Sequence, residues 1–228
     1  RNRGWQAATT EWVLYLDDDA LAYPDLIGKI LHHLQTKKPV LLGGRFEHYF
    51  RTPPPPWIRW YYRESYRPAA QREFSPLPRG SYLVGGILVV QVSLLKKLGG
   101  FSTDFGMRGQ EIGWAEEDEL QDRARAAGYT IHYDPEMVID HLVQPYKYRA
   151  RTRVQMAFSS GRDAAVRYAS STGKYRYLAT AVFRALVTRP PRRIARMFLR
   201  EGYYWQNLLL DTATDLAFAW GQLRNKRA

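Results

Sequence analysis

The sequence predicts an α/β domain followed by a helical C-terminal region, and two observations lead to this prediction. Up to His141, short apolar segments alternate with segments of helical periodicity, whereas the remaining residues show helical periodicity alone. The charge divides at the same place: residues 1–141 contain 17 Lys and Arg against 18 Asp and Glu, and residues 142–228 contain 17 against 4. We therefore predict a nearly neutral body over residues 1–141 and a basic, aromatic helical region over residues 142–228.

The first element expected in the body is a buried strand over residues 12–16, because this apolar run includes aromatic and β-branched side chains. A helix is expected to begin at residues 23–25, since apolar residues then recur at helical spacing over 27–34. The other expected elements are, in order, a strand over 40–42, a polyproline linker over 53–56, a strand over 82–91, a helix over 93–98, a glycine-rich polar loop over 101–113, a helix over 116–127, and strands over 130–133 and 137–139.

The C-terminal region is expected to form amphipathic helices, the first two separated by Pro190-Pro191. In the second helix Arg193, Arg196 and Arg200 share a basic face opposite an apolar one. Trp, Tyr and Arg mixed on such helices suit the headgroup level of a membrane, with the arginines toward anionic lipid. One interpretation is therefore peripheral membrane contact through residues 175–223. The other is a packed helical subdomain with solvated arginines. Nucleic-acid binding is not expected, because no motif of the usual modules accompanies the charge.

The composition excludes some kinds of chemistry. Cysteine is absent, which excludes disulfides, zinc–thiolate sites and cysteine nucleophiles and favours a reducing compartment. No run of 18 uncharged apolar residues occurs, so we expect no segment that spans a bilayer. We accordingly expect a cytoplasmic protein, either free or in peripheral contact with the inner face of the membrane.

The triplet Asp17-Asp18-Asp19, directly after the first strand, is the most informative feature of the chain. An unpaired buried carboxylate is very costly, so these acids are expected at the C-terminal edge of the sheet, where open α/β sheets bind ligands. Asp17 and Asp19 alternate along an extended segment and can reach one ligand, with Asp18 turned away. Clustered oxygen ligands suit Mg²⁺ or Mn²⁺ holding a phosphorylated substrate. A solvated turn that caps the next helix is the alternative interpretation.

Seven short motifs follow one another along residues 1–141. They are Arg1-Asn2-Arg3-Gly4, LDDD at 16–19, VGG at 84–86, LGGF at 98–101, EEDEL at 116–120, RARAAGY at 123–129 and His141. In order and approximate spacing they resemble the motifs of the family-two glycosyltransferases, which are inverting enzymes with the GT-A fold. The resemblance implies a GT-A-like mixed sheet flanked by helices and a nucleoside-diphosphate sugar as donor. It also implies Mn²⁺ or Mg²⁺ and direct transfer to an acceptor hydroxyl, on a carbohydrate or a lipid-linked molecule, in polysaccharide or glycolipid synthesis.

The resemblance also implies roles for the acids and for the late histidine. It assigns Asp19 and His141 to the metal and Asp17 to the metal or the donor ribose, while Asp18 is a donor-binding candidate. It places the catalytic base in the Glu-Asp pair of EEDEL, where Asp118 is the first choice and Glu117 the reserve. From the residues alone, acids at a helix start are ordinary surface neighbours, and a lone histidine after a strand is an ordinary polar residue.

Sugar binding has three further candidates. Gly85 and Gly86 would let the backbone approach the donor, and Trp114 would stack on a sugar ring. The alternatives are a β-bulge at the glycines and a core position for the tryptophan. The polar loop over 101–113 fits a lid that closes over the substrates, or an ordinary surface loop.

The chain differs from the family's pattern in two ways. The family begins with a strand and loop that bind the nucleobase, and no such block occurs, so the chain resembles a member lacking its N-terminal nucleotide-binding third. The Gln-x-x-Arg-Trp block of processive polysaccharide synthases is also absent, which favours transfer of a single sugar. The alternative function, from a different class, is a non-catalytic module that binds a membrane or another polyanion.

Overall fold

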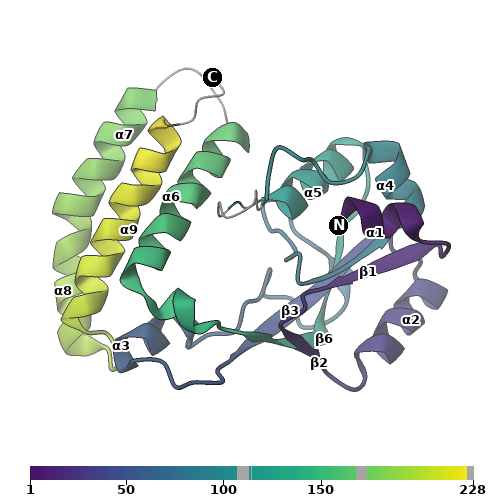
Figure 1. The fold of residues 1–228 in the computed structure, drawn as a ribbon, viewed down its shortest axis with the longest axis horizontal. Helices are drawn as coiled ribbons and strands as arrows, with labels where there is room; N and C mark the ends of the chain where they lie inside the picture. Colours follow the sequence, from purple (N-terminus) through teal and green to yellow (C-terminus); the bar gives the residue numbers. More distant parts are fainter. Residues whose placement is uncertain (107–112, 114, 168–173, 225–228) are drawn as a thin grey trace. The chain divides into compact units, whose positions relative to one another are not determined.

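The computed structural model describes residues 1–106, 113, 115–167 and 174–224. The chain forms two compact units (Figure 1). The first consists of residues 1–51, 64–104 and 116–143, and the second of residues 52–63, 105–115 and 144–228. The second unit thus includes residues 52–63 and 105–115, which the sequence predicts to be part of the 1–141 body.

The first unit contains a six-stranded mixed sheet. Its strands run in the order β1-β5-β3-β6-β2, with β4 paired to β6. The pair β3–β6 is parallel and the other pairs are antiparallel. The predicted α/β class with a mixed sheet is therefore confirmed. The strands are β1 (Trp12–Leu16), β2 (Ala20–Ala22), β3 (Leu41–Tyr49), β4 (Ser75–Pro76), β5 (Ile87–Gln91) and β6 (His132–Leu142).

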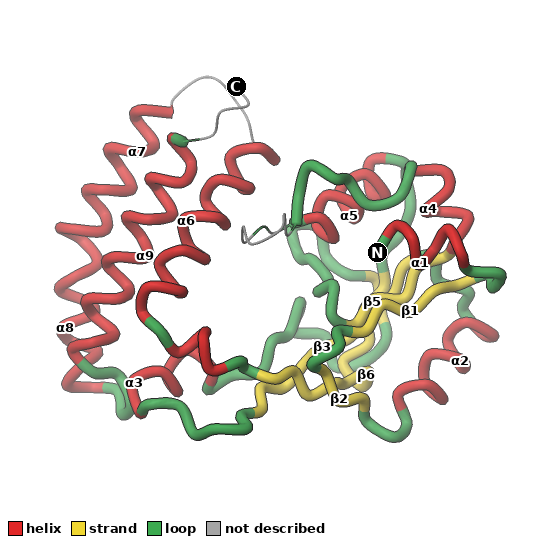
Figure 2. The backbone as a smooth tube through the Cα atoms, viewed as in Figure 1, coloured by secondary structure: helices red, strands yellow, loops and turns green. Residues whose placement is uncertain are grey.

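Helices cover both faces of this sheet (Figure 2). Side chains alternate along β5, so Leu88 and Val90 pack into one core together with α4 and α5, whereas Ile87 and Val89 pack into a second core with α2. Apolar residues on both sides of each strand explain why the central strands appear in the sequence as continuous apolar runs. The helices of this unit are α1 (Asn2–Ala7), α2 (Leu26–Thr36), α4 (Val92–Leu98) and α5 (Glu116–Ala126).

The strand predicted over 82–91 begins only at Ile87, so its first half is wrong. The backbone of Leu83 pairs with a side chain instead of a strand. Its N–H donates to Oε1 of Gln121 at 2.8 Å, and its carbonyl accepts a hydrogen bond from Nε2 of Gln121 at 3.0 Å. Because Gln121 is fully buried on α5, these two bonds fix the 82–86 segment against that helix.

The strands predicted over 130–133 and 137–139 form one strand, β6, and the segment 40–42 is the start of the nine-residue strand β3. The two strands run parallel, with a register shift between the pairs Gly43–Tyr133 and Arg45–Val138. This irregularity accommodates Pro135, which cannot donate a ladder hydrogen bond. The prediction of two separate strands was wrong because the polar residues 134–136 interrupt the apolar run locally. The short strand β2 was not predicted.

The second unit is helical in its described part, and α9 packs against α6, α7 and α8. No described helix is long and apolar enough to cross a membrane. The α-helices of this unit are α3 (Pro56–Arg59), α6 (Ala150–Arg167), α7 (Lys174–Phe183), α8 (Arg189–Leu199) and α9 (Trp205–Leu223). Its other helical segments are the 3₁₀ helices η1 (Trp60–Tyr62) and η2 (Pro145–Tyr148) and the π-helical η3 (Arg184–Thr188).

Three prolines of this unit lie at the start of a helix. Pro56 opens α3, so the predicted linker leads directly into a helix. Pro190 and Pro191 lie in the first turn of α8, where a missing N–H is tolerated. The π-helical η3 connects α7 to α8 without a break in the helical path. The prediction that Pro190-Pro191 separates two helices was therefore wrong, because the chain changes its hydrogen-bonding pattern there and stays helical.

Candidate functional site

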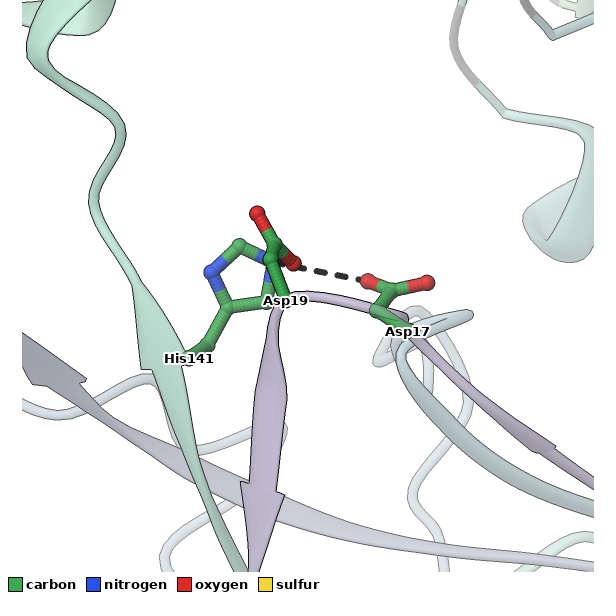
Figure 3. A group of neighbouring side chains, drawn as sticks. All are labelled: Asp17, Asp19 and His141. Carbon is green, nitrogen blue, oxygen red and sulfur yellow. Dashed lines mark ion pairs between the residues drawn. The ribbon is translucent and has the colours of Figure 1, made fainter.

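Asp17, Asp19 and His141 form a cluster at one edge of the sheet. One ligand atom from each of them lies within 4.8 Å of the other two. Nε2 of His141 is 3.4 Å from Oδ2 of Asp17 and 3.5 Å from Oδ1 of Asp19. The three side chains point toward one another (Figure 3). All three are partly exposed, so a ligand can reach them from solvent.

The register of the sheet brings these residues together. Asp17 follows β1, and Asp19 immediately precedes β2. Strand β2 pairs with β6 so that Ala20 lies opposite His141, and the N–H of Leu142 donates to the carbonyl of Asp19 at 3.1 Å. The imidazole is therefore placed beside the acids by strand pairing. Asp18, between them, is exposed and outside the cluster that the described residues form.

The donor set of this cluster fits a divalent cation. Two carboxylate oxygens are the ligands that Mg²⁺ and Mn²⁺ prefer, and one imidazole nitrogen shifts the preference toward a transition metal. Asp17, Asp19 and His141 together would leave coordination positions for oxygen atoms of a ligand, because they supply fewer donors than octahedral geometry requires. Mn²⁺ therefore fits the residues present better than Mg²⁺.

Gly85 and Gly86 connect this cluster to the start of α5. The N–H of Asp17 donates to the carbonyl of Gly86 at 3.3 Å, and a β-carbon on Gly86 would lie 2.6 Å from Oδ2 of Asp17. The N–H of Gly85 donates to Oε1 of Glu117 at 3.3 Å. Gly86 thus contacts Asp17 of the cluster, and Gly85 contacts Glu117 at the start of α5. The two acidic motifs therefore lie at the same edge of the first unit, which we call its rim.

Two acids at the start of α5, Glu116 and Glu117, pair with Arg1, and one of them has a raised pKa. Nη1 of Arg1 lies 3.1 Å from Oε1 of Glu116 and 3.3 Å from Oε2 of Glu117. Burial raises the pKa of Glu116 to about 7, the neighbouring charge of Glu117 adds to the rise, and Arg1 opposes it. Tyr82 also contacts α5, because its hydroxyl donates a hydrogen bond to Oδ1 of Asp122 at 2.8 Å.

Two stacked aromatic rings lie beside the histidine. The ring of Phe46 on β3 is 5.3 Å from that of His141 and is stacked on Tyr66 at 5.1 Å. The hydroxyl of Tyr66 donates to the carbonyl of Tyr82 at 3.1 Å. The pKa of Tyr66 is raised to about 12, mainly by burial and also by the negative charges of Asp118 and Glu117.

The structure thus brings most of the predicted site residues to one region. Asp17, Asp19 and His141 meet, Gly85 and Gly86 adjoin them, and Glu117 and Asp118 begin the neighbouring helix. Trp114 lies outside the described residues, as does most of the loop predicted over 101–113. Sequence reasoning missed Arg1, Phe46, Tyr66 and Gln121, of which Arg1 alone lies within a recognised motif. For Phe46, Tyr66 and Gln121 the sequence holds no signal, because their place depends on pairing across the fold.

Comparison with known proteins supplies a family and a fold. Residues 1–99 match the family model described as "Glycosyl transferase family 2". Among solved structures, the mannosyltransferase PcManGT from Pyrobaculum calidifontis, in complex with GDP-Man and Mn²⁺, matches with a TM-score of 0.56 at 17% identity, over 99% of this chain and 66% of that chain. GalNAc-T7 with UDP, GalNAc and Mn²⁺ matches with a TM-score of 0.45 at 11% identity, over 71% of this chain and 34% of that chain. No curated protein matches.

The first of these structural matches shows that the chain has a GT-A-like fold. The chain spans 66% of the length of that mannosyltransferase.

Proposed function

We propose that this chain, whose residues 1–99 match the model described as "Glycosyl transferase family 2", is a metal-dependent, inverting glycosyltransferase of that family. It would move one sugar from a nucleoside-diphosphate sugar to an acceptor hydroxyl, in polysaccharide or glycolipid synthesis. The observation that carries the proposal is the cluster of Asp17, Asp19 and His141 within 4.8 Å, on the same rim as the acids of α5. The first donor that we would test is GDP-mannose, which PcManGT binds.

The cluster would bind the diphosphate end of the donor. Asp17, Asp19 and His141 would hold Mn²⁺ or Mg²⁺, which when bound neutralises negative charge on the departing diphosphate. Gly86 lacks a side chain beside Asp17, so its backbone leaves room for the donor next to the cluster. Asp18, exposed at the turn, would contact a more distant part of the donor.

The start of α5 would supply the base. In our proposal the acceptor oxygen attacks the anomeric carbon, its proton passes to Asp118, and the bond from that carbon to the diphosphate oxygen breaks with its electron pair leaving on the diphosphate. This single displacement inverts the configuration. Glu117 accepts a hydrogen bond from Gly85 and pairs with Arg1, which suits a residue that positions the glycine segment. These contacts favour Asp118 over Glu117 as the base.

Tyr66 would position a sugar ring. Tyr66 is 36% exposed, its ring is stacked on Phe46, and the charges of Asp118 and Glu117 act on its hydroxyl. An aromatic face of this kind packs against the C–H face of a sugar without fixing its chemistry. We propose that Tyr66 takes the stacking role that the sequence suggested for Trp114.

A donor screen tests the proposed function. The full gene product is incubated with a panel of GDP- and UDP-sugars and Mn²⁺ or Mg²⁺, and release of nucleoside diphosphate is measured with and without carbohydrate and lipid-linked acceptors. We expect release that depends on one donor and on the metal, and that is lost in Asp19→Ala. No release with any donor would favour the alternative of a non-catalytic binding module.

A further inference from the structure

Helix α8 presents its apolar side chains to solvent and an arginine toward the rest of its unit. The side chain of Arg193 is 11% exposed, whereas Phe198 is 81% exposed and Leu199 78% exposed. This is the reverse of the usual arrangement, in which a surface helix buries its apolar face.

Ion pairs to α9 hold the inward face of α8. Nη2 of Arg193 lies 2.8 Å from Oδ2 of Asp215, and its Nη1 donates to Oγ1 of Thr212 at 3.2 Å. Nη1 of Arg189 lies 2.5 Å from the other oxygen of Asp215. These contacts fix the rotation of α8 about its axis. Arg193 therefore does not belong to a basic face turned toward lipid, and that prediction was wrong for this residue, because its charge is neutralised by acids on α9.

Exposed apolar side chains remain at the end of α7, on η3 and on α8, and we call them the outer apolar face. In Figure 1 α8 continues α7 along one side of α9, and α8 packs against α9 and η3. Monomeric proteins rarely expose large contiguous apolar surfaces without a partner. Six residues form the face, each 46% exposed or more: Phe183, Leu186, Val187, Ile194, Phe198 and Leu199.

The charges around this face are almost all positive. Between residues 184 and 204 the sequence contains six Arg and one acid, Glu201, and two of these arginines, Arg189 and Arg193, pair with Asp215. Arg184, Arg192 and Arg200 are exposed, and none of them forms an ion pair within the described part of the chain. Apolar side chains flanked by exposed arginines match an anionic bilayer, where the rings and aliphatic chains enter the acyl boundary and the guanidinium groups stay among the phosphates.

We propose that η3 and α8 form a peripheral docking surface for an anionic lipid bilayer, with the outer apolar face roughly 5–10 Å into the headgroup and acyl boundary. This is surface binding, since no described helix is long and apolar enough to span a membrane. The surface would keep the enzyme near acceptors that are themselves lipid-linked. Binding to lipid does not require sugar transfer, so the two proposals can fail separately.

Vesicle co-sedimentation of the full gene product tests this surface, with vesicles of phosphatidylcholine alone or mixed with phosphatidylglycerol. We expect binding to the mixed vesicles that weakens as salt is added, and at least about a tenfold weaker affinity in the double variant Phe198→Glu/Leu199→Glu. The matched control is Ile27→Glu/Leu31→Glu on α2, where the two replaced side chains are 52% and 50% exposed. This control should bind vesicles like the unmodified protein. Circular dichroism of both variants verifies that they fold.

Three results would overturn the proposal. The first is no binding of the unmodified protein to the mixed vesicles. The second is equal binding to both lipid compositions, because the arginines would then contribute nothing. The third is self-association seen by light scattering and abolished by Phe198→Glu/Leu199→Glu, without any vesicle binding, which would identify a second copy of the chain as the occupant.

Discussion

The β-carbon position of Gly86 lies 2.6 Å from Oδ2 of Asp17, so a side chain at residue 86 would displace this carboxylate. The carbonyl of Gly86 also accepts a hydrogen bond from the N–H of Asp17 at 3.3 Å. The backbone of the VGG motif therefore sets the position of a carboxylate in the LDDD motif. This contact links two motifs that the sequence offers as separate blocks.

Replacing Gly86 with alanine should displace the Asp17 carboxylate and weaken Mn²⁺ binding by about tenfold. The effect on stability should be small, because the displaced atoms are the end of a flexible side chain. Electron paramagnetic resonance of free Mn²⁺ measures the affinity, and thermal unfolding measures the stability. Gly28→Ala on α2 is the control, since a β-carbon there meets nothing within 4 Å. Equal Mn²⁺ affinity in Gly86→Ala and in the unmodified protein would contradict this prediction.

Neighbouring acids of the triplet should differ in their effect on the metal. Asp19→Ala removes one of the three proposed ligands and should weaken Mn²⁺ binding by about a hundredfold, with loss of metal-dependent nucleotide binding. Asp18→Ala should leave Mn²⁺ affinity unchanged, because Asp18 is exposed outside the cluster of described residues. Titration calorimetry with Mn²⁺ measures both variants. A similar loss in the two variants would mean that the triplet acts only through its total charge.

Asp118→Asn in the full gene product should lower the turnover of sugar transfer by about 10²–10⁴-fold, because the amide cannot take the acceptor's proton. Donor binding should change little, since Asp118 lies outside the metal cluster. Steady-state kinetics and donor titration separate the two effects. Unchanged turnover would refute the role of Asp118, and Glu117→Gln is then the variant to measure.

Tyr66→Ala should reduce kcat/KM for transfer by about tenfold, because the sugar loses an aromatic surface. Tyr66→Phe keeps the ring, which is stacked on Phe46 at 5.1 Å, and should retain most of the activity. Kinetics with both variants tests the idea. If phenylalanine is as harmful as alanine, the hydroxyl that donates to the carbonyl of Tyr82 is the important group and stacking is not.

Glu116 should make the protein less stable as the pH rises toward neutrality. Burial raises its pKa from 4.5 to about 7, so between these values the folded state binds the proton that the unfolded state has released. This contribution to stability is complete below about pH 4.5 and falls by at most about 1.4 kcal/mol per pH unit until about pH 7. Urea unfolding between about pH 5 and about pH 8 measures the slope. Glu116→Gln should flatten it, and parallel curves for the two proteins would exclude Glu116 as the group responsible.

Local patterns in the sequence were sufficient for several elements. The strand over 12–16 and the helix over 116–126 follow from runs and end signals that lie within each segment. The α4 helix ends at Leu98, directly before the glycine pair that predicted its end. The resemblance to the family-two glycosyltransferases also follows from local motifs, because each motif lies within one short segment.

These local patterns do not predict which strands pair or in which register. Local patterns do not predict the register that sets Ala20 opposite His141, nor the two hydrogen bonds between Leu83 and Gln121 that hold the 82–86 segment against α5. The two strands predicted over 130–133 and 137–139 form one strand, β6, because β3 pairs with β6 on both sides of the polar residues between them. Pairing of this kind joins residues that are distant in sequence, so no local window records it.

By itself, then, the sequence determined the α/β class, the resemblance to the family-two glycosyltransferases, and which acids and histidine are suited to hold a cation. Only the tertiary structure decided that Asp17, Asp19 and His141 share one point, that Gly85 and Gly86 adjoin both acidic groups, and that α8 turns its apolar side outward. The physical reason is that periodicity and charge are properties of a segment. The direction in which a segment faces is set by the partners that pair with it, such as β2 for His141 and the acids of α9 for Arg193.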